Sequence, residues 1–189
     1  ADVLTGTKAA DRISAGAGND MIVGMSSGDT IDGGAGADNI SIAGTSADLN
    51  TAEDGQLVSV ESVSLDAASP TSTDAVVLDL SRQGEGFTIY AASKVANKIS
   101  GGKGADKTEG IIGGAGTDTI NGFAGGDFID GGAGADILVL ATTSTDLNKA
   151  SNAQLNNVEI VSALSATDAV TIDLSSQTEA FSIIGGSAS

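Results

Sequence analysis

Gly33-Gly34-Ala35-Gly36-Ala37-Asp38-Asn39-Ile40 closes a run of nine-residue steps. In that run the aspartates stand nine residues apart, and an isoleucine follows each of them by two residues: Asp11, Asp20, Asp29 and Asp38, with Ile13, Ile22, Ile31 and Ile40. The same order returns downstream at Asp118, Asp127 and Asp136, and residues 131–136 repeat residues 33–38 letter for letter. The chain is therefore built from a repeat that occurs in two separate runs.

A nine-residue step matches neither the period of a strand nor that of a helix, so it predicts a short strand followed by a tight turn. The three residues after each aspartate are expected to form the strand, with the isoleucine pointing inward. The turn takes glycine because glycine adopts a positive φ freely. The predicted turn glycines are Gly16, Gly18, Gly33, Gly34, Gly36, Gly102, Gly104, Gly114, Gly116, Gly132 and Gly134.

Two steps make one coil, so equivalent residues recur every eighteen positions and stack about 4.8 Å apart. Carboxylates stacked this closely repel one another unless a cation lies between them. Carboxylate and turn carbonyl oxygens are the ligands that Ca²⁺ prefers. The predicted pairs, about four to five sites in all, are Asp11 with Asp29, Asp20 with Asp38, Asp118 with Asp136, Asp106 with Asp127, and, more weakly, Asn97 with Asp118. A flexible glycine-rich linker is the alternative, but a linker has no reason to keep Asp and Ile in phase.

The runs resemble the RTX, or haemolysin-type, calcium-binding nonapeptide repeat, Gly-Gly-x-Gly-x-Asp-x-U-x with an apolar residue at U. The best copies are residues 33–41, 113–121 and 131–139. The resemblance implies a right-handed parallel β-roll, a form of β-solenoid, with Ca²⁺ held between successive turns. It also implies secretion through a type I system.

The chain divides into two similar units, each a nonapeptide run followed by a spacer. The expected boundaries are 1–43 and 94–141 for the runs, and 44–93 and 142–189 for the spacers. A helix is expected to begin near residue 47, with Ser46 or Asp48 as its cap. Spacer strands must stack on the roll, so we expect one continuous solenoid, cut from a longer array. Between Asp106 and Asp118 the step is twelve residues, which predicts a three-residue bulge within residues 107–112.

Hydrophobicity predicts which side chains of the spacers lie in the core. Phe87, Phe181 and Tyr90 are expected in the core, together with the aliphatic residues. Glu61 and Glu159 recur at equivalent positions and are expected on an outer face, with a spacer cation site as the open alternative.

Composition restricts the possible partners. With 25 acidic and 8 basic residues, the formal net charge of −17 argues against nucleic acid and anionic membranes. The absence of cysteine and histidine removes disulfides, thiolate sites and the commonest general base. No apolar run approaches the length of a membrane span. Equivalent carboxylates in a repeat also make a poor acid–base pair, so no catalytic residue is predicted and the chain is not expected to be an enzyme.

Three functions remain open. The first is a non-catalytic calcium-binding segment of a secreted, extracellular cell-surface protein, an adhesin or S-layer protein, which could self-associate or bind surface polysaccharide. The second is the calcium-binding module of a secreted hydrolase or toxin. The third is a solenoid that binds ice or polysaccharide through a flat row of Thr or aromatic side chains.

Overall fold

The computed structural model describes residues 1–26, 28–65, 75–91, 94–104 and 110–186. These described residues contain seventeen short strands and three short helices, in this order: β1 Val3–Thr5, β2 Arg12–Ser14, β3 Met21–Val23, β4 Thr30–Asp32, β5 Asn39–Ile42, α1 Ala47–Thr51, η1 Asp54–Gln56, β6 Leu57–Val58, β7 Ser62–Leu65, β8 Val77–Asp79, β9 Thr88–Tyr90, β10 Lys98–Ser100, β11 Ile111–Ile112, β12 Thr119–Asn121, β13 Ile129–Asp130, β14 Ile137–Val139, η2 Leu147–Lys149, β15 Leu155–Asn156, β16 Ile160–Ser162 and β17 Ser182–Ile184.

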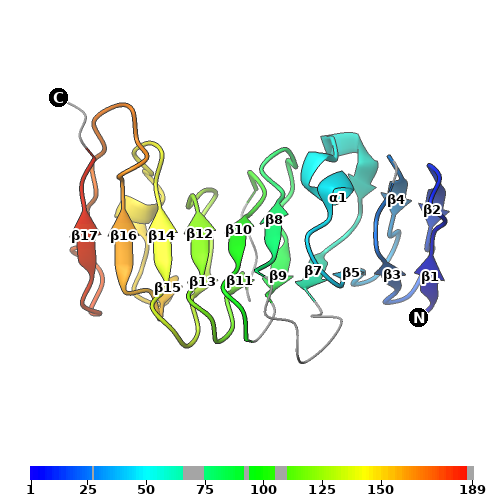
Figure 1. The fold of residues 1–189 in the computed structure, drawn as a ribbon, viewed down its shortest axis with the longest axis horizontal. Coiled ribbons are helices and arrows are strands. Elements are labelled where there is room, and N and C mark those ends of the chain that lie inside the picture. The colour runs from blue at the N-terminus through cyan, green and yellow to red at the C-terminus, as the bar shows by residue number, and fades with distance from the viewer. Residues whose placement is uncertain (27, 66–74, 92–93, 105–109, 187–189) are drawn as a thin grey trace.

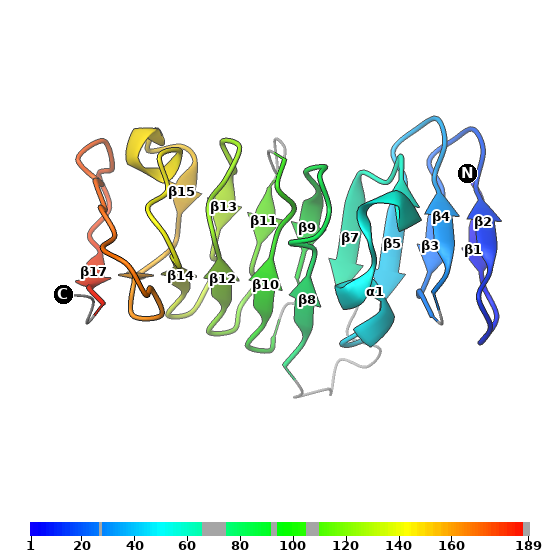
Figure 2. The ribbon, with the colours of Figure 1, turned by 90° about the horizontal axis from the view of Figure 1, so that it is seen from above.

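The strands wind into a parallel β-solenoid whose coils follow one axis (Figure 1). Odd-numbered strands β1 to β15 form an eight-stranded sheet. The other side consists of a three-stranded sheet, β2-β4-β6, and a six-stranded sheet that runs from β8 through β10, β12, β14 and β16 to β17 (Figure 2). All strand pairs are parallel, so the predicted solenoid is confirmed.

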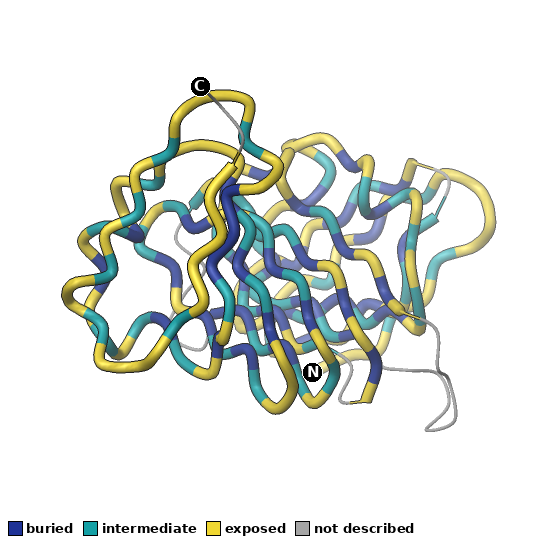
Figure 3. The backbone as a smooth tube through the Cα atoms, turned by 60° about the vertical axis from the view of Figure 1, so that its left-hand side comes forward, coloured by how far each residue is buried: buried dark blue, intermediate teal, exposed yellow. Residues whose placement is uncertain are grey.

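The nine-residue step produces these coils in the predicted register. Ile22 on β3 pairs with Ile40 on β5, and Ile13 on β2 pairs with Ile31 on β4, each eighteen residues along the chain. All four isoleucines are buried and alternate with more exposed neighbours. Buried positions therefore follow one another along the interior of the coil (Figure 3).

The spacer begins with α1, and Ser46 rather than Asp48 is its cap. The Ser46 hydroxyl accepts a hydrogen bond from the Leu49 N–H, and Leu49 is buried against the coil. Asn50 then acts in place of a strand, because its side-chain amide donates to Val77 O at 3.0 Å and accepts from Asp79 N at 2.9 Å. The sheet on this side of the solenoid is therefore interrupted between β6 and β8.

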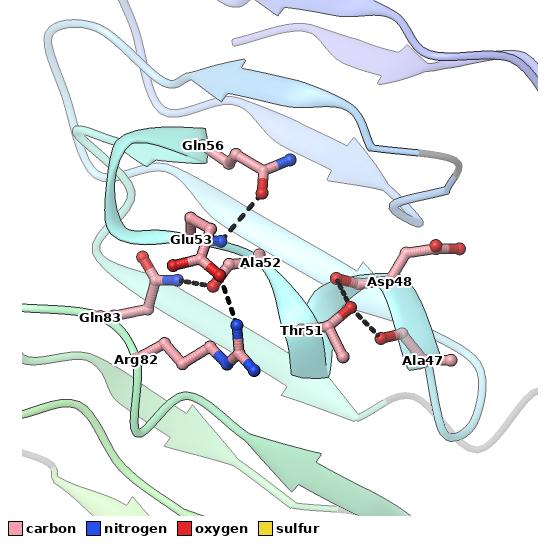
Figure 4. Close-up of polar contacts among 8 residues, drawn as sticks. All are labelled: Ala47, Asp48, Thr51, Ala52, Glu53, Gln56, Arg82 and Gln83. Atoms are coloured by element: carbon pink, nitrogen blue, oxygen red, sulfur yellow. Dashed lines mark hydrogen bonds and ion pairs between the residues drawn. The ribbon is translucent and has the colours of Figure 1, made fainter.

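The loop after α1 is held to the next coil by side chains of residues 82 and 83 (Figure 4). Gln83 is fully buried and donates to Ala52 O at 2.8 Å, while Arg82 forms an ion pair with Glu53. Gln177 makes the equivalent bond to Ala150 O at 2.8 Å in the second spacer. Both spacers thus attach to the solenoid in the same way.

The aromatic predictions are right for Phe87 and wrong for Tyr90. Phe87 is fully buried and Phe181 is partly buried against the core. Tyr90 is 38% exposed, because it follows the inward-facing Ile89 on a strand, where successive side chains point to opposite faces. Among the described residues, no helix has the length and apolar character needed to cross a membrane.

The two units differ in which side of the solenoid they use. β3, β5 and β7 of the first unit are equivalent to β12, β14 and β16 of the second, which lie nine strands later. Because nine is odd, β3, β5 and β7 belong to the eight-stranded sheet, whereas β12, β14 and β16 belong to the six-stranded sheet. Equivalent turns therefore lie on opposite edges of the solenoid.

Candidate metal centres

Two columns of acidic side chains run along the solenoid, one in each unit. The first column is Asp2, Asp20, Asp38 and Glu61, and the second is Asn97, Asp118, Asp136 and Glu159; each member stands two residues before the inward-facing residue of its strand.

The aspartates that follow the first member of each column use one oxygen to accept a backbone N–H of the preceding coil. The N–H of Asp20 donates to Asp38 Oδ1 at 2.8 Å, and the N–H of Asp118 donates to Asp136 Oδ1 at 2.7 Å. These bonds fix the carboxylates in line along the axis, so that equivalent oxygens of successive coils face the same turn region.

The other carboxylate oxygen is the unusual one. Within the described part of the chain, Oδ2 is buried and has no hydrogen-bond partner in four aspartates: Asp20, Asp38, Asp118 and Asp136. These side chains are at most 2% exposed. Leaving a buried carboxylate oxygen without a partner is costly, which indicates that a cation belongs beside it.

The glycine turns, defined as residues 15–20, 33–38, 113–118 and 131–136, leave no room for side chains around these oxygens. A Cβ on Gly34 would lie 2.1 Å from Gly16 O, and one on Gly36 would lie 1.8 Å from Gly18 O. Gly34 and Gly36 also have positive φ. Backbone carbonyls of one coil thus lie directly against the turn of the next, as a cation bound through carbonyl oxygens requires.

In the second unit, too, the turn glycines lie close to carbonyl oxygens of the preceding coil. A Cβ on Gly132 would lie 2.0 Å from Gly114 O, and one on Gly134 would lie 1.9 Å from Gly116 O. The close approach of the coils therefore explains glycine at Gly34, Gly36, Gly132 and Gly134, which lie in the same turns as the aspartates of the two columns.

Burial also changes the acidity of the second column. The pKa of Asp118 is raised to about 6. Desolvation is the main cause and the Asp136 charge contributes to the rise, while hydrogen bonds from Asn97 oppose it. Desolvation likewise raises the pKa of Asp136, with Glu159 and Asp130 contributing to the rise. Both shifts express the cost of a charged carboxylate in this position without a compensating positive charge.

Together these features fit a hard, oxygen-bound cation. Among the described residues, no group of three or more His, Cys, Asp or Glu side chains converges on one point. A cation in a column would therefore be held by Asp20 with Asp38, or Asp118 with Asp136, and by the turn carbonyls. Bound Ca²⁺ would supply the positive charge that offsets the stacked carboxylates.

The predicted pair Asp11 and Asp29 lies in a turn of a different kind. The backbone N–H of Asp11 donates to Asp29 Oδ1 at 2.8 Å, and the Asp29 Oδ2 atom accepts from Ser26 N at 2.8 Å. Asp11 Oδ2 accepts from the N–H and hydroxyl of Thr7. Both oxygens of Asp29 therefore have backbone donors, whereas the described aspartates of the glycine turns have a donor on Oδ1 alone.

A large apolar side chain accompanies this second kind of turn. Met25 and Phe123 stand at the second position of their turns and are 6% and 3% exposed. In the Phe123 turn, Asp127 Oδ2 accepts from Ala124 N at 2.7 Å, just as Asp29 does from Ser26. We call these two the plugged turns.

The remaining predicted ligands lie elsewhere. Asp106, the predicted partner of Asp127, and residues 107–109 of the predicted bulge lie outside the described residues. Gly102 and Gly104 lie against Glu85 and Gly86 of the first spacer, where a Cβ on Gly102 would be 1.9 Å from Glu85 O. Ile111 pairs with Ile129, so the eighteen-residue register is restored after the predicted bulge.

Asn97 begins the second column and places its amide nitrogen among oxygens. Its Nδ2 lies 3.0 Å from Val95 O, 3.3 Å from Gly113 O and 3.0 Å from Asp118 Oδ1. These three oxygens are the kind that a cation would collect. The role of Asn97 as a weak metal ligand stays a prediction. In this structure its Nδ2 atom donates hydrogen bonds to these oxygens.

Glu61 and Glu159 close the two columns. Glu159 is exposed, as an outer-face position predicts, and Glu61 is partly buried, but the hydrogen bonds of both side chains to the columns were not predicted. Glu61 Oε2 accepts from Asp38 N at 2.8 Å, and Glu159 Oε2 accepts from Asp136 N at 2.7 Å. The sequence did contain a signal: both glutamates stand two residues before an inward-facing strand residue, as the aspartates do. A spacing of 23 rather than 18 residues hid it.

Paired carboxylates between glycine turns of a parallel β-solenoid define a calcium-binding repeat protein. The family model for the RTX calcium-binding nonapeptide repeat (four copies) matches residues 1–28, 15–41 and 111–138. These segments are RTX calcium-binding nonapeptide repeats, and they contain all four aspartates with an unpartnered Oδ2. Comparison with curated proteins and with solved structures gave no match.

Proposed function

We propose that this chain is a non-catalytic, calcium-binding structural segment of a secreted bacterial cell-surface protein, of the adhesin or S-layer kind. The observation that carries the proposal is the pair of aspartate columns, each with buried oxygens that have no partner, built into one solenoid that includes both spacers. A solenoid that continues through its spacers is suited to act as a stalk or a lattice element.

Ca²⁺ would act as the folding switch. At a net charge of −17 the metal-free chain repels itself, and the columns concentrate that charge in the interior. Binding to the folded state alone couples metal binding to folding. Extracellular modules bind Ca²⁺ with Kd values of about 10⁻⁴ to 10⁻³ M, so such a chain would stay unfolded inside the cell and fold outside it.

The outward side chains of the sheets give little support to the alternative function, binding of ice or polysaccharide by a flat row of side chains. On the six-stranded sheet the outward row reads Val77, Lys98, Thr119, Ile137, Ile160 and Ser182. Asn39, which has the same place in the repeat as Thr119, lies on the eight-stranded sheet on the other side. This row contains a single threonine, Thr119, so it is not a flat array of threonine side chains.

Circular dichroism and light scattering during a Ca²⁺ titration, with Mg²⁺ as the control, test the proposal. A cooperative transition from coil to β structure with Ca²⁺ alone is expected. A rise in particle size at the same point would favour a lattice-forming protein over a monomeric stalk. A chain that is fully folded in chelator would overturn the role of Ca²⁺ as the folding switch.

A further inference from the structure

The step from each nonapeptide run into its spacer repeats the hydrogen bonding of the steps before it. Inside the runs, Asp38 Oδ1 and Asp136 Oδ1 accept the N–H of the aspartate one coil earlier. At the next step, Glu61 and Glu159 accept the N–H of Asp38 and Asp136 in the same way. Each glutamate thus takes the place of an aspartate and retains a second carboxylate oxygen.

The spacer turn explains why the residue is glutamate. Six residues, 33–38, connect β4 to β5, but only three, 59–61, connect β6 to β7. Asn39 still pairs with Ser62, so the strands keep their register across a shorter turn. The longer side chain of Glu61 allows the carboxylate to reach the column from this shorter turn.

A backbone carbonyl of the spacer also takes the place of a glycine carbonyl. A Cβ on Gly113 would lie 2.4 Å from Gly131 O of the next coil, and a Cβ on Gly131 would lie 2.0 Å from Asn157 O. In the first unit, Ser59 O holds the same position against Gly33, also at 2.0 Å. Ser59 and Asn157 are the two described non-glycine residues with positive φ, at 53° and 52°.

A positive φ is uncommon for a residue other than glycine. Both units nevertheless have it at the same place. The strained backbone therefore accompanies the close approach of this carbonyl to the last glycine turn, beside the glutamate.

The third component is the unpartnered oxygen of the last aspartate. Asp38 and Asp136 are fully buried, and Oδ2 of each has no partner among the described residues. A Cβ on Gly33 would lie 2.8 Å from Asp38 Oδ2, and one on Gly131 would lie 2.8 Å from Asp136 Oδ2. The unpartnered oxygen and the spacer carbonyl thus approach the same glycine.

We propose that Glu61 and Glu159 each complete a further Ca²⁺ site, at the junction between the last nonapeptide turn and the spacer. The ligands would be the carboxylates of Glu61 and Asp38 with Ser59 O in the first unit, and of Glu159 and Asp136 with Asn157 O in the second. The exposed Glu159 leaves room for water to fill the remaining positions. This inference rests on the proposed function, because it extends the calcium column into the spacer.

The test is to count bound Ca²⁺ by isothermal titration calorimetry in the full chain and in the double variant Glu61→Gln, Glu159→Gln. Glutamine keeps an acceptor for the N–H of Asp38 and Asp136 but loses the charge. The double variant is expected to bind two fewer ions, one per glutamate. Asp168→Asn removes one charge at an exposed site outside the columns, so it is the control for each single variant, Glu61→Gln or Glu159→Gln, and is expected to bind the wild-type number.

The outcomes separate this inference from the proposed function. A wild-type chain that binds Ca²⁺ and a double variant that binds the same number with the same affinity would overturn the junction sites alone. A wild-type chain that binds no Ca²⁺ would overturn both. If the double variant does not fold in Ca²⁺, the two single variants each keep one intact column and are each expected to lose one ion.

Discussion

The glycine turns and the plugged turns follow the same nine-residue step but treat their aspartate in different ways. In the glycine turns, Asp38 and Asp136 leave one buried oxygen without a partner. In the plugged turns, Asp29 and Asp127 receive an N–H from within their own turn. An aspartate in phase therefore does not by itself leave a carboxylate oxygen without a protein donor.

The difference starts at the second position of the turn. Glycine at that position, as in Gly34 and Gly132, allows the backbone to approach the neighbouring coil within a distance that a Cβ would prevent. Met25 and Phe123 instead fill the corner of the core. We therefore expect the glycine turns to depend on a bound cation for their stability and the plugged turns to depend on apolar packing.

The two kinds of turn also differ in the residue that follows them in the spacer. The columns of the glycine turns end in the carboxylates of Glu61 and Glu159. The plugged turns are followed by Gln56 and Gln154, whose amides donate to Asp29 O at 2.9 Å and Asp127 O at 3.3 Å. In each unit an amide donor thus follows the plugged turns, while a carboxylate follows the glycine turns.

The largest effect is expected from closing a glycine turn with a methyl group. Gly132→Ala would place a Cβ 2.0 Å from Gly114 O at a positive φ, so we expect a loss of more than about 4 kcal/mol in the free energy of unfolding. Gly122→Ala in a plugged turn also has a positive φ but open space around it, so about 1–2 kcal/mol is expected. Urea unfolding in the presence of Ca²⁺ measures the free energy of unfolding of both variants. Equal losses in the two variants would contradict the close approach of the coils at the glycine turn.

The plugged turns should be sensitive to core truncation instead. Phe123→Ala removes a buried side chain and is expected to cost about 3–5 kcal/mol without changing the number of bound ions. Phe128→Ala is the control, because Phe128 is 37% exposed and truncation there should cost much less. Thermal unfolding together with calorimetric ion counting checks this prediction, and loss of an ion in Phe123→Ala would show that the plugged turn does contribute to a metal site.

Removing the charge of a single aspartate should distinguish the two turns by their metal binding. Asp38→Asn is expected to lower Ca²⁺ affinity at least tenfold, about 1.4 kcal/mol, because its unpartnered oxygen belongs to the column. Asp29→Asn should leave affinity unchanged, because both Asp29 oxygens have backbone donors. Calorimetric titration of the two variants decides the matter, and equal losses would contradict the division into two kinds of turn.

The sequence predicted the coils and the glycine turns because both follow from local spacing. Ile22 and Ile40 pair as their eighteen-residue separation predicts, and Ser46 caps α1. The roles of Glu61 and Glu159 were missed because they depend on the length of a spacer turn. The placement of the two columns on opposite edges was missed for a related reason: it depends on the number of strands in a whole unit.

The smallest effect concerns the one place where the two columns differ. The first column begins with Asp2, whose N–H donates to Asp20 Oδ1, and the second begins with Asn97, whose N–H donates to Asp118 Oδ1. The Asn97 amide nitrogen additionally contacts three oxygens that a cation would otherwise share. An asparagine here gives the second column a neutral beginning.

Asn97→Asp should therefore convert this beginning into a cation site. We expect one additional bound Ca²⁺ and, in chelator, a loss of about 1 kcal/mol in stability as the amide hydrogen bonds are removed. Asn121→Asp makes the same chemical change on β12 outside the column, and it should add no ion. If Asn97→Asp binds the wild-type number of ions in calorimetry, the amide does not occupy a potential cation position, and the two columns are equivalent in their capacity for Ca²⁺.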